Sequence, residues 1–142
     1  MKSFTAQIED FKNLTMRNLK YVMQHSISDV LIAAQTTQIG IGQGATSFVE
    51  GKIPVDKSIL VNSLTVDGAS GPDSYTVAIA NMEPGDVKRF AWTAPYAHRI
   101  EVGFTGDDSL GRTYNVPGRH FVGVNAAKFS EFVKERVAEV RK

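Results

Sequence analysis

Glycine and proline are confined to the middle of this chain of 142 residues. All 12 glycines and all 5 prolines lie between Gly40 and Gly123. These two residues disfavour a helix interior more than any others, so both ends of the chain are free to be helical and the turns must fall between them. The distribution therefore predicts terminal helices that flank a region of strands and turns.

The N-terminal segment has the apolar spacing of an amphipathic helix, and Ser3 is the expected N-cap. Its apolar residues recur mostly in steps of three and four: Phe4, Ile8, Phe11, Leu14, Leu19, Val22, Met23, Ile27, Val30, Leu31 and Ala34. A helix that continues to about Thr36 has roughly 30 residues and a length of ~45 Å. A break near residues 26–28 is the alternative. A continuous helix exceeds what one small core covers, so one end is expected to pack on another body.

Residues 38–53 are predicted to form a flexible arm or loop within a single domain that spans residues 1–142. The stretch is rich in glycine, yet Ile39, Ile41, Phe48 and Val49 are too apolar for a plain linker. An arm that becomes ordered against a neighbouring subunit reconciles both properties. An ordinary surface loop folded onto its own domain is the open alternative.

The middle of the chain has the alternation of an antiparallel sheet. Expected strands lie at 60–66, at 75–79 after a turn-rich run, at 87–93 with the only tryptophan, and at 112–116. From about Asn125, a second helix carries Phe129 and Val133 on one face. The predicted fold is an α+β domain with a long N-terminal helix, an antiparallel sheet of three to four strands, and a C-terminal helix packed on the sheet.

Composition and charge exclude several classes of protein. The net charge is +1, from 16 basic and 15 acidic residues, without the basic excess of a dedicated nucleic-acid binder. The chain has no cysteine, which removes disulfides, thiolate nucleophiles and zinc ribbons. No apolar run approaches the roughly 20 residues that span a bilayer. We expect no membrane contact and no cofactor.

Motifs for chemistry are weak. His98, Glu101 and His120 are of ligand type for a metal-dependent hydrolase, but their spacing matches no metal motif. The glycines at 40–44 lack the lysine ending of a phosphate-binding loop and follow a helix instead of a strand. No serine has a recognisable base beside it. We therefore expect a protein that is not an enzyme.

Three segments in order resemble the tail-completion or head–tail joining proteins in the neck of long-tailed double-stranded DNA bacteriophages. The segments are 53–64 (IPVDKSILVNSL), 95–103 (PYAHRIEVG) and 117–122 (PGRHFV), the last just before the terminal helix. The resemblance implies a structural virion protein that forms a ring, in six copies, between tail tube and head. It implies as partners other copies of the chain, tail-tube proteins and head-completion or connector proteins. A tail terminator that caps the tube is the alternative, and a small metal-dependent hydrolase is a remote one.

The ring implied by this resemblance places the protein in the virion, after assembly in the cytoplasm of the bacterial host. The expected interface residues come from the arm, the first helix and the aromatic run: Ile39, Ile41, Phe48, Val49, Phe4, Ile8, Phe11, Trp92 and Tyr96. DNA would pass through the lumen of such a ring. Arg112 and Arg119, in a predicted loop, are the weaker expectation for passive contact with its phosphates.

Overall fold

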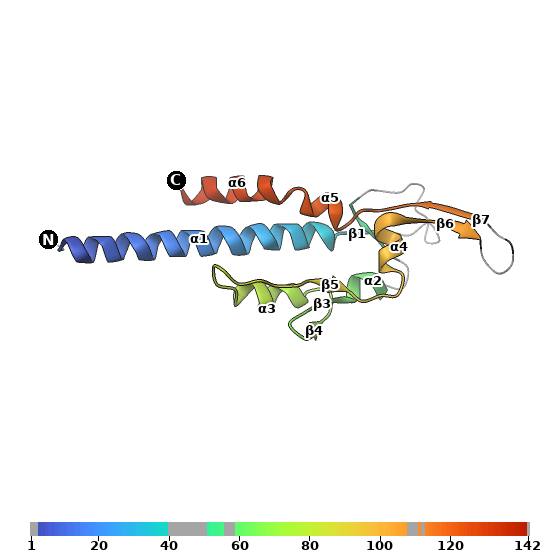
Figure 1. Cartoon of the computed structure of the whole chain (residues 1–142), viewed down its shortest axis with the longest axis horizontal. Helices are drawn as coiled ribbons and strands as arrows, with labels where there is room; N and C mark the ends of the chain where they lie inside the picture. The colour runs from blue at the N-terminus through green and yellow to red at the C-terminus, as the bar shows by residue number, and fades with distance from the viewer. Residues whose placement is uncertain (1–2, 40–50, 56–58, 108–110, 112, 142) are drawn as a thin grey trace.

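The structure is a computed structural model that describes residues 3–39, 51–55, 59–107, 111 and 113–141. One long helix runs through the middle of the molecule, with the C-terminal helices on one side and a small sheet with a short helix on the other (Figure 1). The helices are α1 (Phe4–Ala34), α2 (Ile59–Asn62), α3 (Ser74–Ala80), α4 (Ala97–Val102), α5 (Gly123–Ala126) and α6 (Phe129–Val140). The strands are β1 (Thr37–Ile39), β2 (Ile53–Val55), β3 (Leu64–Val66), β4 (Ala69–Ser70), β5 (Ala91–Trp92), β6 (Gly103–Asp107) and β7 (Thr113–Pro117). The α+β class is confirmed.

Helix α1 is continuous over 31 residues, which rules out the predicted alternative of a break at 26–28. Ser3 caps it as expected, because its hydroxyl oxygen accepts a hydrogen bond from the Ala6 backbone N–H at 3.1 Å. At the other end the Gln35 N–H donates to the Leu31 carbonyl at 2.9 Å. At 1.5 Å per residue the helix is about 46 Å long.

The C-terminal helix α6 packs along α1, and not on the sheet as the sequence predicted. The guanidinium of Arg136 donates to both carboxylate oxygens of Asp29, at 2.9 and 2.7 Å. The Tyr21 hydroxyl donates to the Glu139 carboxylate at 2.6 Å. The difference has a simple cause: the apolar stripe of α1 offers α6 a helical face, and the small sheet lies on the opposite side of α1.

The main sheet has three antiparallel strands in the order β4-β3-β5. Leu64 lies opposite Trp92, and Thr65 opposite Ser70. The expected strand at 87–93 is reduced to the two residues of β5. The expected strand at 112–116 belongs instead to a separate hairpin, in which β7 pairs with β6. The strand expected at 60–66 is wrong over residues 60–62, which belong to helix α2, and only Leu64–Val66 form strand β3. Helix α4 was not predicted.

The strand predicted at 75–79 is wrong, because the chain forms helix α3 there. Ala78 and Ile79 are adjacent and both buried, whereas Val77 is 69 % exposed. Neighbouring buried residues beside an exposed one fit a helical face and not the strict alternation of a strand. Three apolar residues at every second position are too few to separate the two structures.

The ends of the predicted arm are ordered as a parallel pair of strands, with Thr37 opposite Ile53. Residues 40–50 of the arm, including Ile41, Phe48 and Val49, lie outside the described residues. In the described part of the chain, none of the helices combines the length and apolarity that a bilayer crossing requires.

Candidate functional site

The three segments that carry the phage resemblance meet in one core. Ile53 and Leu60 of the first segment and Phe121 of the third are at most 2 % exposed and touch one another in a single cluster. Tyr96 and Ile100 of the second segment pack against this cluster. Sequence order alone could not show this convergence. The resemblance therefore concerns one structural unit and not three unrelated turns.

The backbones of the second and third segments cross at very short range. The N–H of Arg119 donates to the Ile100 carbonyl at 2.7 Å, and the N–H of His120 donates to the Glu101 carbonyl at 3.1 Å. A Cβ at Gly118 would lie 2.6 Å from the Glu101 carbonyl oxygen, which is backbone and cannot turn away. Position 118 therefore requires glycine. At Gly103, φ is +88°, a backbone conformation that favours glycine.

The Glu101 carboxylate is occupied by backbone groups. Its two oxygens accept from the N–H groups of Val122 and Gly123, each at 2.9 Å, and so satisfy the start of α5. His98 is exposed. Within the described residues no group of three or more His, Cys, Asp or Glu side chains is gathered for a metal ion. The proposed ligand set of His98, Glu101 and His120 is therefore not brought together.

Two polar residues that sequence reasoning missed hold this unit. The buried Asn125 side chain donates to the carbonyls of Gly51 and Phe121, at 2.8 and 2.7 Å. The Gln35 amide donates to the Val61 and Pro72 carbonyls, both at 3.0 Å. The only sequence signal for Asn125 is a polar residue inside the apolar run 121–127, and Gln35 gives no signal at all.

Trp92 and Tyr96, expected at an interface, are half-buried against this core. The Trp92 indole N–H donates to the side-chain amide oxygen (Oε1) of Gln35 at 2.7 Å. Its ring meets Phe121 edge to face, with centroids 5.2 Å apart. Both aromatic residues thus stabilise the fold, and their part in an interface stays a prediction.

Arg119 is 5 % exposed, which is the wrong environment for contact with DNA phosphates. Burial also lowers its pKa from the ordinary value. The expectation placed it in a solvated loop, but the crossing with Ile100 draws it inward. Arg112 lies outside the described residues, and Ile39 is described only as a backbone position in β1.

The N-terminal part of α1 is uncovered. Phe4 is 77 % exposed, Ile8 52 % and Phe11 69 %. Of residues 4–17, all but Ala6 are exposed. Figure 1 shows this end of α1 extending beyond the C-terminal end of α6. Three large apolar side chains in line on a projecting helix are typical of a surface that another protein covers.

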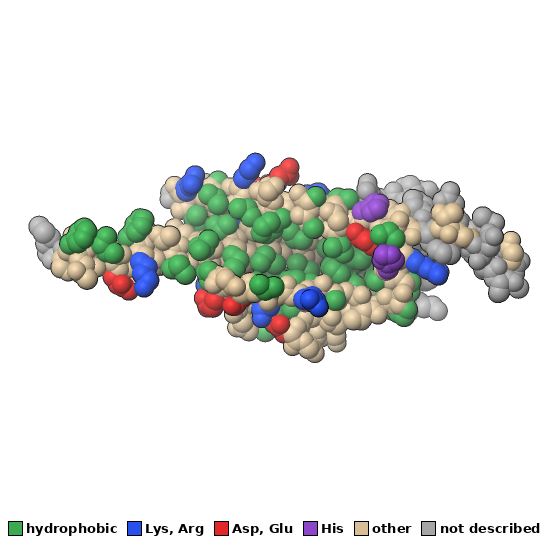
Figure 2. All heavy atoms as spheres, viewed as in Figure 1, with side chains coloured by type: hydrophobic (Ala, Val, Ile, Leu, Met, Phe, Trp, Pro, Cys, Tyr) green, Lys and Arg blue, Asp and Glu red, His purple; other side chains and the backbone are tan. Residues whose placement is uncertain are grey.

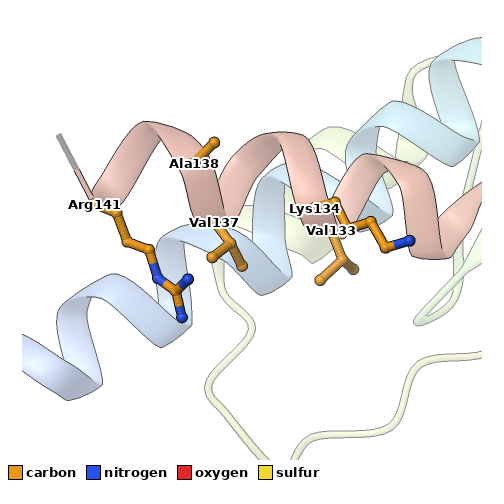
Figure 3. A pocket seen from close by; sticks show the side chains of 5 residues that line it. All are labelled: Val133, Lys134, Val137, Ala138 and Arg141. Carbon is orange, nitrogen blue, oxygen red and sulfur yellow. The ribbon is translucent and has the colours of Figure 1, made fainter.

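An apolar hollow of about 430 Å³ lies between α1 and α6 beside this projecting end. We name it the apolar seam, and its apolar lining comes from Leu19, Val22, Val133, Val137 and Val140. In Figure 3 Val133 and Val137 point from α6 toward α1, and Arg141 reaches across to α1.

A second hollow of about 310 Å³ lies further along α1, between Ile27, Val30, Leu31, Phe90, Ala126 and Phe129. Figure 2 shows hydrophobic side chains gathered over this side of the molecule. Together the two hollows give one face of α1 and α6 an apolar, indented surface. Such surfaces usually mark protein interaction sites.

Comparisons with protein-family models, with curated proteins and with solved structures gave no match. The functional interpretation therefore depends on the residues and geometry described above, and on the resemblance carried by the three segments.

Proposed function

We propose that this chain is a structural subunit of the neck of a long-tailed bacteriophage, which joins copies of itself into a ring between tail tube and head. The observation that carries the proposal is the uncovered end of α1, with Phe4, Ile8 and Phe11 exposed in one line. Burying one such side chain contributes roughly 1.5–3 kcal/mol. A chain that leaves three of them in water gains that stabilisation when a neighbour covers them.

The shape of the molecule supports an assembly role. Helix α1 projects at one end, and the β6–β7 hairpin projects at the other (Figure 1). A two-stranded hairpin is marginally stable in water unless something packs on it. Projections at opposite ends allow one subunit to contact two neighbours, as a ring requires.

The use of the polar groups supports a structural role over a catalytic one. The side chains of Glu101, Gln35 and Asn125 each bind backbone groups in or beside the three segments. These contacts fix where the three segments lie. The segments that carry the resemblance to neck proteins are therefore joined to one another by hydrogen bonds as well as by apolar contacts.

Electron microscopy of lysates from a phage that lacks this gene tests the proposal. We expect filled heads lying beside unattached tails of normal length. Unattached tails that are over-long would instead assign the protein as a tail terminator. Intact and infectious particles would overturn both assignments. Metal analysis of protein purified without chelators is the independent check on the hydrolase alternative, which requires stoichiometric metal.

A further inference from the structure

We propose that residues 4–14 of one copy bind in the apolar seam of a second copy, as a helix in a groove. This inference deepens the proposed ring-forming role and rests on it. It assigns two of the apolar surfaces that the fold leaves uncovered to each other. The argument uses the spacing of the exposed residues, the continuity of α1, the sizes of the two surfaces, and their charges.

The exposed residues continue a face of α1 that is already an interface. Phe4, Ile8 and Phe11 are followed at the same three- and four-residue steps by Thr15, Leu19 and Val22, which line the seam with α6. Steps of three and four keep these side chains on one side of a helix. Helix α6 covers this face only as far as its own last turn. The uncovered part therefore has the character of a surface that accepts another helix.

The segment and the seam cannot meet within one molecule. The segment and the α1 side of the seam belong to the same helix, which is continuous from Phe4 to Ala34. Ile8 and Leu19 are held about 16 Å apart by the rise of the helix. A straight helix cannot fold its own end back into a groove along its side. The occupant must come from another molecule, and a second copy supplies the segment at the same concentration as the seam.

The segment and the seam agree in length. Residues 4–14 span about 16 Å, and the 12 residues of α6 span about 18 Å. Two mostly exposed phenylalanines and an isoleucine offer roughly 400 Å² of apolar surface. A contact that covers only this area on the segment is small for a stable complex. A closed ring gives each subunit two such contacts, so assembly should be strongly concentration-dependent.

Charge favours the same encounter. The segment carries Glu9 and Asp10 against the single basic residue Lys12. Arg141 is the charged residue in the lining of the seam, where it forms a basic rim, and its side chain reaches toward α1 (Figure 3). A net acidic helix that approaches a basic rim is oriented before contact, and this speeds association more than it tightens binding.

The contact is heterologous, because it joins a segment on one copy to a seam on the next. In an open chain of such contacts, one end subunit keeps an unused segment and the other end subunit keeps an unused seam until the chain closes. If the rotation that relates neighbouring copies closes on itself, the copies form a ring, and otherwise they form a filament. The mixing experiment that follows uses this property.

The test uses two variants of the whole chain and their equimolar mixture, with mass measured by analytical ultracentrifugation across about 1–100 µM. The segment variant is Phe4→Ser with Ile8→Ser and Phe11→Ser, which keeps the seam. The seam variant is Leu19→Glu with Arg141→Glu, which keeps the segment. Val77→Ser is the matched control, since Val77 is 69 % exposed on α3 and away from both surfaces.

We expect the wild-type chain and the Val77→Ser control to assemble beyond a dimer. Each of the two variants should associate at least about 100-fold more weakly than the wild type, since a few central apolar side chains dominate such contacts. Circular dichroism should show that both variants remain helical. Their mixture should form a pair of one copy each and stop, because only one intact segment and one intact seam remain.

Three results would contradict either the segment-to-seam contact or the ring-forming role, and each result has a different meaning. If the segment variant assembles like the wild type, or if the mixture forms no pair, the contact is wrong while the ring-forming role stands. If the wild-type chain stops at a dimer, the contact survives and the ring is overturned. If the wild-type chain stays monomeric throughout, a second copy is not the occupant, and the inference fails.

Discussion

The two halves of α1 have the same amphipathic spacing and opposite surroundings. Along residues 18–34 the helix is clamped by α6 on one side and contacted by the α3 region on the other, as in the hydrogen bond from Gln24 to the Met82 carbonyl at 3.0 Å. Along residues 4–17 nearly every residue is exposed. The pattern of apolar residues specifies that a face will be covered. Whether the cover comes from the same chain or from another is decided by where α6 ends.

The largest expected difference between the halves is the cost of deleting an apolar side chain. Leu31 is 5 % exposed, so Leu31→Ala should lower the free energy of unfolding by about 2–5 kcal/mol. Phe11→Ala, at a position 69 % exposed, should change it by less than about 0.5 kcal/mol in the monomer. Urea unfolding at low protein concentration measures both. A comparable loss for Phe11→Ala would mean that the projecting half is covered within its own chain.

The polar contacts between α1 and α6, Arg136–Asp29 and Tyr21–Glu139, are named the polar clamp. Removing one of them should give a smaller difference in stability between the two halves of α1. Arg136 donates to both oxygens of Asp29, and the two side chains are 25 % and 16 % exposed. Arg136→Met should destabilise the fold by about 1–3 kcal/mol, between the values for surface and buried pairs. Arg17→Met, in the uncovered half, is the control and should be close to neutral. Equal effects in thermal unfolding would contradict the clamp.

Low pH should weaken the contact between α6 and the covered half of α1. The hydrogen bond from Tyr21, and then the contacts with Arg136, hold the pKa of Glu139 below its usual value. This stabilisation is present above the unfolded-state pKa, near 4.5, and is lost as the pH falls through the lower folded-state pKa. Unfolding of wild-type protein should therefore depend on pH in this window more steeply than unfolding of Glu139→Gln. Glu135→Gln, on the same helix, is the control, and an unchanged slope in Glu139→Gln would remove Glu139 from the clamp.

The dependence of stability on pH has the opposite sign for Tyr21, whose pKa is raised chiefly by its hydrogen bond to Glu139. Its neutral hydroxyl contributes stability below pH 10, and that contribution is lost as the pH rises through the higher folded-state pKa. Spectrophotometric titration of the tyrosines should show one fewer group ionising near pH 10 in wild-type protein than in Glu139→Gln. Identical titrations would show that the Tyr21–Glu139 hydrogen bond does not form in solution.

The smallest expected effect is a gain in stability from a substitution within the covered half of α1. Ser26 on α1 is fully buried, and its hydroxyl has no hydrogen-bond partner among the described residues. Ser26→Ala removes this unsatisfied group and should stabilise the fold by up to about 1 kcal/mol. Ser28→Ala, at a half-buried position on the same helix, should be nearly neutral. A clear loss of thermal stability in Ser26→Ala would mean that the hydroxyl is satisfied in solution.

The terminal helices were predictable because their evidence is local. The run from Phe4 to Ala34 has helical spacing, a Ser3 cap and no glycine or proline, and each of these acts within a few residues. Helix α3 was missed because Tyr75, Val77 and Ile79 alternate like a strand over too short a range. What decides there is contact with α1, which a sequence does not contain.

The candidate site was less predictable than the fold, since it depends on contacts across long stretches of sequence. The exposure of Phe4, Ile8 and Phe11 followed from the excess length of the helix. The burial of Arg119 and the need for glycine at position 118 both arise where two segments cross. Loop position gave the wrong environment for Arg119, because a loop that passes over another backbone is not a solvated one.

Helix α1 also has a mechanical consequence. One half is fixed in the body of the protein and the other is free, so the helix acts as a lever whose fulcrum is the Tyr21–Glu139 contact. With an arm of about 25 Å, a tilt of 5° at that contact moves Phe4 by about 2 Å. Small changes in the polar clamp therefore set the position of the apolar tip, which is the exposed line of Phe4, Ile8 and Phe11. The curvature of any assembly built through that tip would be tuned by residues that never touch the neighbour.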